Sequence, residues 1–96
     1  MPNRRTPNTE ESEIIALKAL GFLAADPDRL ERFLALTGMT PQAIRPLAAD
    51  PMFLGGVLDH LLSDQTLLLV FAETAGLTPG GIEAARASLP GAANDF

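Results

Sequence analysis

Residues 26–44, DPDRLERFLALTGMTPQAI, contain the start of one helix, its end and the start of the next. Asp26 and Thr40 each precede a proline. This pair is typical of a helix start, because the side chain accepts hydrogen bonds from first-turn amides and proline needs no partner for its missing N–H. Gly38 followed by Met39 predicts a left-handed helix end on which the next apolar side chain packs back. The stretch predicts short helices joined by tight turns.

The same signals recur outside this stretch. Asp50 and Thr78 also precede prolines, Asp64 follows a serine, and Asn8 begins a capping-box pattern. Gly76 repeats the helix end of Gly38, and no alternating run bounded by hairpin turns indicates a strand. We therefore expect an all-α fold, a compact bundle of five or six short helices. The predicted helices cover residues 9–25, 27–37, 41–48, 51–62, 64–75 and 79–89.

An internal repeat relates the two halves of the chain. A shift of 38 residues superposes apolar, capping and glycine positions of the first half on those of the second. The matched pairs include Leu20 with Leu58, Asp26 with Asp64, Phe33 with Phe71, Gly38 with Gly76 and Ile44 with Ile82. The repeat predicts two three-helix units around a pseudo-twofold axis; the alternative is that a helical bundle simply reuses the same caps.

Composition limits the function classes. The 96 residues suit one domain, which we place at 9–90, with flexible segments at 1–8 and 91–96. Apolar residues make up 47% of the chain and its net charge is −5, which disfavours nucleic acid and anionic membranes as partners. The chain has no cysteine, no signal-peptide pattern and no apolar run long enough to span a membrane. These features predict a cytoplasmic location.

The sequence offers no convincing catalytic group. His60 is the only histidine, and Asp64 follows one helical turn later. A metal or general-base role would need further partners, so a surface histidine near a helix end is the simpler interpretation. Residues 78–81, TPGG, lack the lysine of a phosphate-binding loop. We therefore predict no enzyme activity, no cofactor and no catalytic, cofactor-binding or metal-ligating residues.

A helix-turn-helix pattern is the main alternative. Ala72, Gly76 and Ile82 have the spacing of such a motif, and the first half repeats it. One expected recognition helix contains Pro46, however, and the other carries a single arginine beside a glutamate. DNA recognition needs more basic and amide side chains than these.

Two features of the later helices point to packing. Gly55 and Gly56 lie within the predicted helix 51–62, which suggests that another helix crosses closely there. The helix 64–75 is apolar nearly all round, so we expect it to be central or part of an interface. The large apolar side chains least needed by the repeat form our candidate interaction surface: Met52, Phe53, Leu69 and Val70. Burial in the core, or a homodimer contact through the last two, are the alternatives.

Residues 17–77, LKALGFLAADPDRLERFLALTGMTPQAIRPLAADPMFLGGVLDHLLSDQTLLLVFAETAGL, resemble a family of short alphaproteobacterial proteins catalogued as domain of unknown function 3572. The resemblance covers about residues 13–90. It implies a small stand-alone bacterial cytosolic protein with a signalling-related partner, and it supplies no catalytic residues. We therefore expect a non-enzymatic protein-interaction or adaptor module. The alternatives are a helix-turn-helix-like DNA-binding regulator and a self-associating structural protein.

Overall fold

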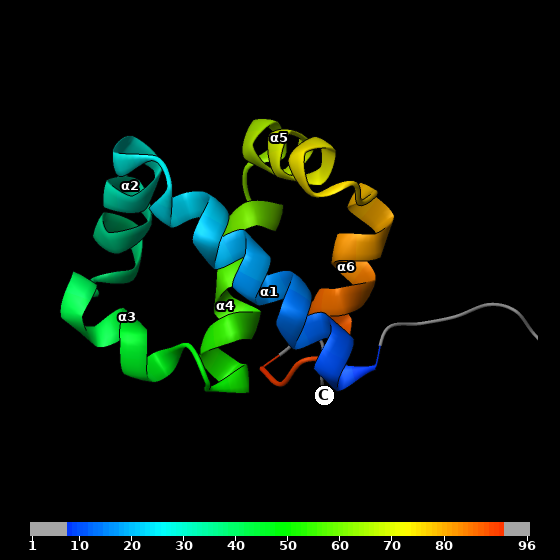
Figure 1. Cartoon of the computed structure of the whole chain (residues 1–96), viewed down its shortest axis with the longest axis horizontal. Helices are drawn as coiled ribbons and strands as arrows, with labels where there is room; N and C mark the ends of the chain where they lie inside the picture. Colours follow the sequence, from blue (N-terminus) through cyan, green and yellow to red (C-terminus); the bar gives the residue numbers. More distant parts are fainter. Residues whose placement is uncertain (1–7, 92–96) are drawn as a thin grey trace, which may run out of the picture.

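The computed structural model describes residues 8–91, which form six α-helices and, within that range, no strand (Figure 1). The predicted all-α fold is confirmed, and the predicted helix bounds differ from the observed ones by no more than two residues. Of the segments expected to be flexible, 1–8 and 91–96, only Asn8 and Gly91 are among the described residues; Asn8 caps α1, and the Gly91 carbonyl accepts from Arg86. The helices are α1 Thr9–Ala24, α2 Pro27–Thr37, α3 Pro41–Leu47, α4 Pro51–Leu62, α5 Gln65–Ala75 and α6 Pro79–Ala87.

Side-chain caps begin five of the six helices. Asn8 forms the expected capping box, and Asp26, Asp50, Asp64 and Thr78 each accept a hydrogen bond from a first-turn amide. The predicted side-chain cap at residue 40 is wrong, because among the described residues that threonine makes no capping hydrogen bond. The Ala43 amide, which a capping side chain would have bound, donates instead to the backbone carbonyl oxygen of Thr40 at 3.0 Å.

The two glycine helix ends have the predicted conformation. Gly38 has φ of 74° and Gly76 has φ of 70°, both in the left-handed region that favours glycine. The next amide bonds back over a whole turn in each case: Met39 N donates to the Leu34 carbonyl at 3.2 Å, and Leu77 N donates to the matching carbonyl of α5 at 2.8 Å. Each turn therefore redirects the chain sharply into the following helix.

Reciprocal ring contacts support the predicted pseudo-twofold arrangement. The rings of Phe22 and Phe71 lie 5.3 Å apart, and those of His60 and Phe33 lie 5.0 Å apart. In the 38-residue register Phe22 corresponds to His60 and Phe71 corresponds to Phe33, so the same contact is made twice in opposite directions. The helices α1 and α4 cross at the centre, with α2 and α3 on one side and α5 and α6 on the other (Figure 1).

The third helix of each half packs differently. The helix α6 packs on α1, α4 and α5 and buries Ile82, Ala85 and Arg86. By contrast, none of the residues of α3 is buried, and α3 packs extensively against no other described helix. The two halves therefore share their turns and their first two helices, whereas only the second half closes completely.

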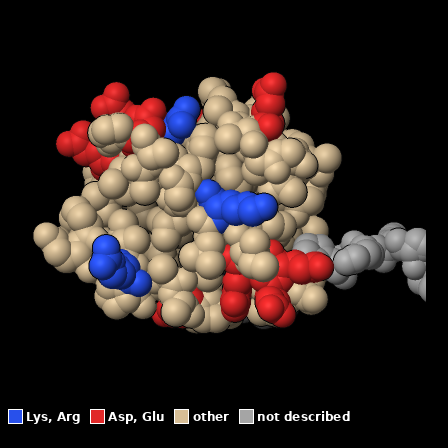
Figure 2. Space-filling model, in the orientation of Figure 1, with Lys and Arg blue, Asp and Glu red and all other residues tan. Residues whose placement is uncertain are grey.

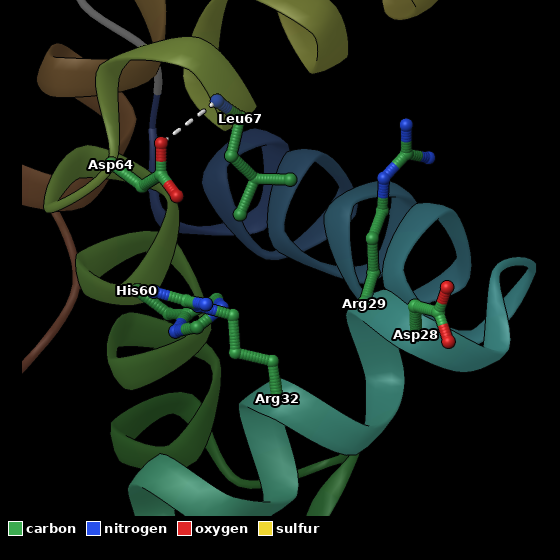
Figure 3. A pocket seen from close by; sticks show the side chains of 6 residues that line it. All are labelled: Asp28, Arg29, Arg32, His60, Asp64 and Leu67. Atoms are coloured by element: carbon green, nitrogen blue, oxygen red, sulfur yellow. Dashed lines mark hydrogen bonds between the residues drawn. The ribbon is translucent and has the colours of Figure 1, made fainter.

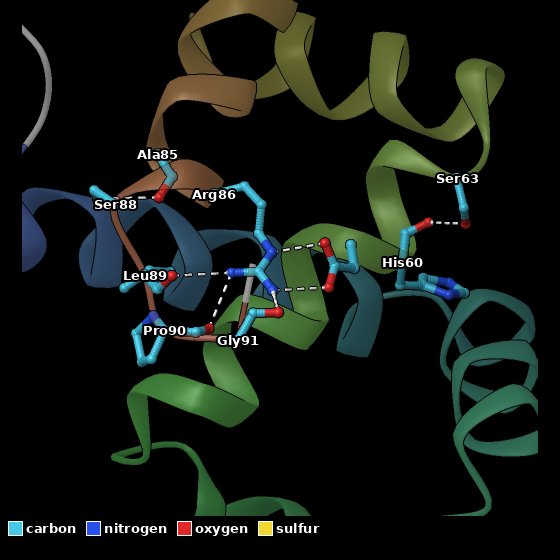
Figure 4. Close-up of polar contacts among 9 residues, drawn as sticks. His60, Ser63, Ala85, Arg86, Ser88, Leu89, Pro90 and Gly91 are labelled. Atoms are coloured by element: carbon cyan, nitrogen blue, oxygen red, sulfur yellow. Dashed lines mark hydrogen bonds and ion pairs between the residues drawn. The ribbon is translucent and has the colours of Figure 1, made fainter. Parts of the chain in front are cut away.

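Arg86 fastens α6 to the centre of the fold (Figure 4). The side chain is only 7% exposed, and its Nε and Nη2 donate to the two carboxylate oxygens of Asp59 at 2.6 and 3.0 Å. Nη1 donates to the carbonyls of Leu89 and Pro90 at 3.2 and 3.1 Å, and Nη2 donates to that of Gly91 at 2.8 Å. One guanidinium thus binds α4 and also satisfies three carbonyls beyond the end of α6.

At one glycine of the pair the close approach comes from a side chain and from the chain beyond α6, rather than from the crossing helix that the sequence suggested. A Cβ atom on Gly55 would lie 2.7 Å from Arg86 Nη1 and 3.0 Å from the Pro90 carbonyl oxygen. A Cβ atom on Gly56 would meet no described atom within 4 Å. Gly55 is therefore required by the approach of the Arg86 guanidinium, and Gly56 is not.

The first and last helices also meet. The Ser12 side chain is fully buried on α1, and its hydroxyl forms a short hydrogen bond with that of Ser88, the residue that ends α6. This contact joins positions near the two ends of the described chain.

The helices α1 and α4 are the central ones. Of the two alternatives for the helix 64–75, the central position is wrong, because Leu69 and Val70 of α5 are 46% and 38% exposed, and the interface stays a prediction. Within residues 8–91 no single helix is long and apolar enough to cross a membrane; α4 and α5 reach that length and hydropathy only as a pair, bent by 112°.

Candidate functional site

An apolar groove lies between α1, α2 and α3, in the half of the molecule where the third helix packs loosely. Its volume is about 390 Å³, within the range of small-molecule and side-chain binding sites. Its walls are apolar apart from one arginine on α3. The lining residues are Leu20, Gly21, Ala24, Leu30, Pro41, Ile44, Arg45 and Ala48.

The repeat explains why the groove is open. In the 38-residue register Gly21 corresponds to Asp59 and Ala48 corresponds to Arg86, the two residues that fasten α6 to α4. The first half therefore lacks both side chains of that ion pair. Both replacements line the groove, and a Cβ atom on Gly21 would meet no described atom within 4 Å. The groove thus exists because this half has two small residues where the other half has its ion pair.

An exposed stripe on α1 leads into the groove. Ile14 and Leu17 are 48% and 44% exposed, and Gly21 and Ala24 are exposed further along the same helix. These four residues, the α1 stripe, are spaced by three or four residues and so share one helix face. The first half of the stripe carries large apolar side chains, and the second half carries small ones beside the groove.

Charged side chains border this face. Figure 2 shows separate basic side chains over α1 and over α3, with uncharged surface between them and acidic side chains near the start of α1. On α3 the basic residue is Arg45, which lines the groove, and the first turn of α1 contains Glu10. The groove therefore offers an apolar floor and a cationic rim on a chain of net charge −5.

The structure places the residues of the sequence-predicted surface in three settings. Met52 is 60% exposed at the start of α4 and lies beside Gly91, where its Cγ would be 3.6 Å from an added Cβ atom. Phe53 is half-buried, with its ring 6.3 Å from that of Phe33. Leu69 and Val70 are neighbours on α5, which follows the far end of α4. The four-residue surface stays a prediction, and none of its residues lines the groove.

A second, polar pocket of about 350 Å³ contains His60 (Figure 3). The predicted surface position of this histidine is wrong, because the residue is half-buried and its ring packs on Phe33. Arg32 reaches toward it, whereas Asp64 caps α5 by accepting from the Leu67 amide at 3.2 Å. His60 Nε2 is buried and has no hydrogen-bond partner among the described residues.

The other pocket residues do not complete a catalytic set. Arg29 lies over the Phe22 ring, with its guanidinium carbon 4.4 Å from the ring centre, and it approaches Asp26 at 3.8 Å. The pocket walls contain no hydroxyl or amine that His60 could activate. Among residues 8–91, no three acidic or histidine side chains gather closely enough to hold a metal ion.

The histidine gives a testable pH dependence. Burial lowers the pKa of His60 below its usual value; Arg32 lowers it further and Asp64 opposes the shift. The folded state therefore favours the neutral imidazole ring. The contribution of this preference to the free energy of unfolding is fully present above the unfolded pKa of about 6.5, and it is lost as the pH falls through the lowered pKa of the folded state. We expect His60→Phe, which copies the matching Phe22, to lose less stability between about pH 7.5 and 5.5 than the parent chain. Urea denaturation followed by circular dichroism measures this difference; equal losses would contradict it.

The helix α6 presents little that DNA could use. Arg86 is its only basic residue, and the guanidinium is turned inward onto Asp59 and the carbonyls beyond the helix. At the start of α6, Thr78 Oγ1 accepts from the Gly81 amide at 2.9 Å, so the side chain already satisfies one of the first-turn donors. The exposed surface of α6 includes Glu83, whose negative charge would repel the phosphates of DNA.

Comparison with known proteins relates the chain to a protein family. A family model described as "Protein of unknown function (DUF3572)" matches residues 9–92, nearly the whole chain. No curated protein and no solved structure matches the sequence or the fold.

Proposed function

The chain belongs to the DUF3572 family, whose description assigns no activity. We propose that this protein is a non-enzymatic protein-interaction module, which binds a helix in the groove beside α1. The observation that carries the proposal is the apolar lining of that groove, which the loose packing of α3 leaves open to solvent. Exposed apolar grooves between helices commonly receive the apolar face of an amphipathic helix.

The chemistry of the groove defines the ligand. Leu20, Leu30 and Ile44 form an apolar floor, and Gly21 allows a backbone to approach without a clash. Arg45 at the rim favours acidic residues beside the apolar face of the partner. The expected ligand is therefore a helix with small and aliphatic residues on one face and acidic residues at its edge.

Site-specific photo-crosslinking tests this proposal. With p-benzoylphenylalanine at Pro41, an exposed groove residue, we expect a crosslinked peptide of the stated character in native cells. The double variant Gly21→Asp, Ala48→Arg copies the ion pair of the second half and fills the groove. It should lower the crosslink yield at least about tenfold, the effect of 1.4 kcal/mol of lost affinity.

Two controls make the experiment decisive. The label at Pro79, the repeat equivalent of Pro41, reports contacts of the closed half and should not capture the same peptide. Circular dichroism should show that the groove-filled variant keeps its helices. Crosslinks that do not depend on the groove-filling substitutions would refute the proposal, as would the absence of any protein adduct.

A further inference from the structure

We propose that protonation of His60 releases α2 from α4, so that the groove beside α1 becomes looser as the pH falls. This inference rests on the proposed function, because it concerns the regulation of the same site. The helix α2 carries Leu30, which forms part of the apolar floor of the groove. A movement of α2 away from α4 therefore changes the surface that the ligand would contact.

One buried side chain anchors α2 to α4. Among the residues of α2, all of which the structure describes, only Phe33 is buried. Its ring lies 5.0 Å from that of His60 and 6.3 Å from that of Phe53, both on α4. The helix also packs on α1, through side chains that are at most partly buried, and it leads through Gly38 into the loosely packed α3. The contact between His60 and Phe33 is therefore an important part of what holds α2 in place.

The neutral ring of His60 fits this contact, and the charged ring does not. Nε2 is buried and has no hydrogen-bond partner among residues 8–91. A protonated imidazole carries a hydrogen on both ring nitrogens, so the charged ring would bury an N–H group for which the described residues provide no acceptor. Burial of an unpaired charged donor is costly. Protonation therefore favours a state in which the ring has left Phe33 and reached water.

The charged groups around the ring strengthen this preference. They come from α2 and from the start of α5, whereas α1 contributes none among the described residues; they are Asp28, Arg29, Arg32 and Asp64. Arg32 reaches toward the ring and repels an imidazolium (Figure 3). Asp64 attracts one, but it already accepts a hydrogen bond from the Leu67 amide at 3.2 Å. On α4 itself, Asp59 is bound to Arg86. Burial and Arg32 outweigh Asp64, because the pKa of His60 lies below its usual value.

The second half of the chain provides an internal comparison. There Phe71 of α5 makes the matching contact with Phe22 of α1, at a ring distance of 5.3 Å. Phe22 stands at the repeat position of His60 and does not titrate. The two halves therefore anchor α2 and α5 in the same way, but only the anchor of α2 contains a group that acid can charge.

The usual pKa of histidine sets the size of the effect. A ring released into water has a pKa of about 6.5, so it takes up a proton between about pH 7.5 and 5.5, which the docked ring resists. Acid then favours the released state, and the equilibrium constant for release should rise by up to about tenfold over this range.

Amide hydrogen exchange of the purified chain at low urea concentrations, followed by NMR at about pH 7.5 and 5.5, tests the inference. The amides of α2 should exchange through an opening that depends less steeply on urea than global unfolding does. Their protection, corrected for the intrinsic exchange rate, should fall by up to about tenfold at the lower pH. The amides of α5 that exchange through their own local opening should keep the same protection at both pH values.

Two variants identify the histidine as the cause. His60→Phe copies Phe22 and should remove the fall in α2 protection. Arg32→Gln should make the fall smaller, because the docked imidazolium is then repelled less. A fall of unchanged size in His60→Phe would overturn the inference. So would amides of α2 that show no fall, or that exchange only with the urea dependence of α1 and α4.

The outcomes are independent of those for the proposed function, because no ligand takes part in the exchange measurement. A groove crosslink from Pro41 without acid-dependent release of α2 leaves the protein-interaction module intact and overturns the pH response. Release of α2 that requires His60, together with no protein adduct at Pro41, supports the pH response and refutes the proposed function.

Discussion

Replacing Arg86 with alanine should lower the free energy of unfolding by about 3 kcal/mol, the loss expected when several charge-assisted hydrogen bonds are removed together. The side chain is buried, and without it the carbonyls of Leu89, Pro90 and Gly91 lose their donor. The contact between α6 and α4 would also lose its only ion pair among the described residues. Urea denaturation monitored by circular dichroism measures the change.

Asp59→Asn provides the matched control. The Asp59 side chain is 57% exposed, so solvent screens its charge and weakens its attraction to the guanidinium. We expect the asparagine variant to lose far less stability than Arg86→Ala, because the three backbone carbonyls keep their donor. Equal losses in the two variants would show that the ion pair, rather than carbonyl binding, holds α6 in place.

Alanine at Gly55 should lower the free energy of unfolding by about 2 kcal/mol, whereas alanine at Gly56 should raise it by up to about 1 kcal/mol. Both residues lie in the middle of α4, so the gain in helix propensity is the same for both. Only the first substitution brings a Cβ atom into the guanidinium and a backbone carbonyl oxygen. Thermal denaturation of the two variants side by side measures the difference.

The clash predicts a coupling between two positions. Because part of the cost of Gly55→Ala comes from Arg86, the double variant with Arg86→Ala should lose less than the sum of the single losses. Additive losses, or Gly55→Ala and Gly56→Ala variants of equal stability, would show that the approach of Arg86 does not require glycine at position 55.

The fold was predictable because its helix ends rely on local chemistry. Asp26, Asp50 and Asp64 cap helices in the structure as in the sequence, since the cap and its donor lie within three residues of each other. The inward turn of Arg86 was not predictable in this way. Its partner Asp59 is 27 residues away, and an arginine in a short helix ordinarily faces solvent.

The candidate site depends on such distant contacts. In the repeat, Gly21 and Ala48 stand where the second half has Asp59 and Arg86. The sequence alone does not show that this difference opens a groove, because the contact by which the second pair joins α4 and α6 is visible only in the structure. The position of α5 was not predictable for a related reason. Apolar side chains such as Leu69 and Val70 can be buried in the core or exposed on the surface, and the sequence pattern of an apolar helix does not distinguish these two cases.

The contact between Ser12 and Ser88 has a consequence for local unfolding. Because it joins the first helix to the end of the last, fraying at either end of the described chain breaks the same contact. Amide hydrogen exchange in α1 and α6 should then report a shared opening event. The helix α3 buries none of its residues and takes no part in that contact. Only partly buried side chains of α3, such as Ile44, pack against the core. We therefore expect α3 to open at a lower free-energy cost than α1 or α6, so that the amides of this groove wall exchange first.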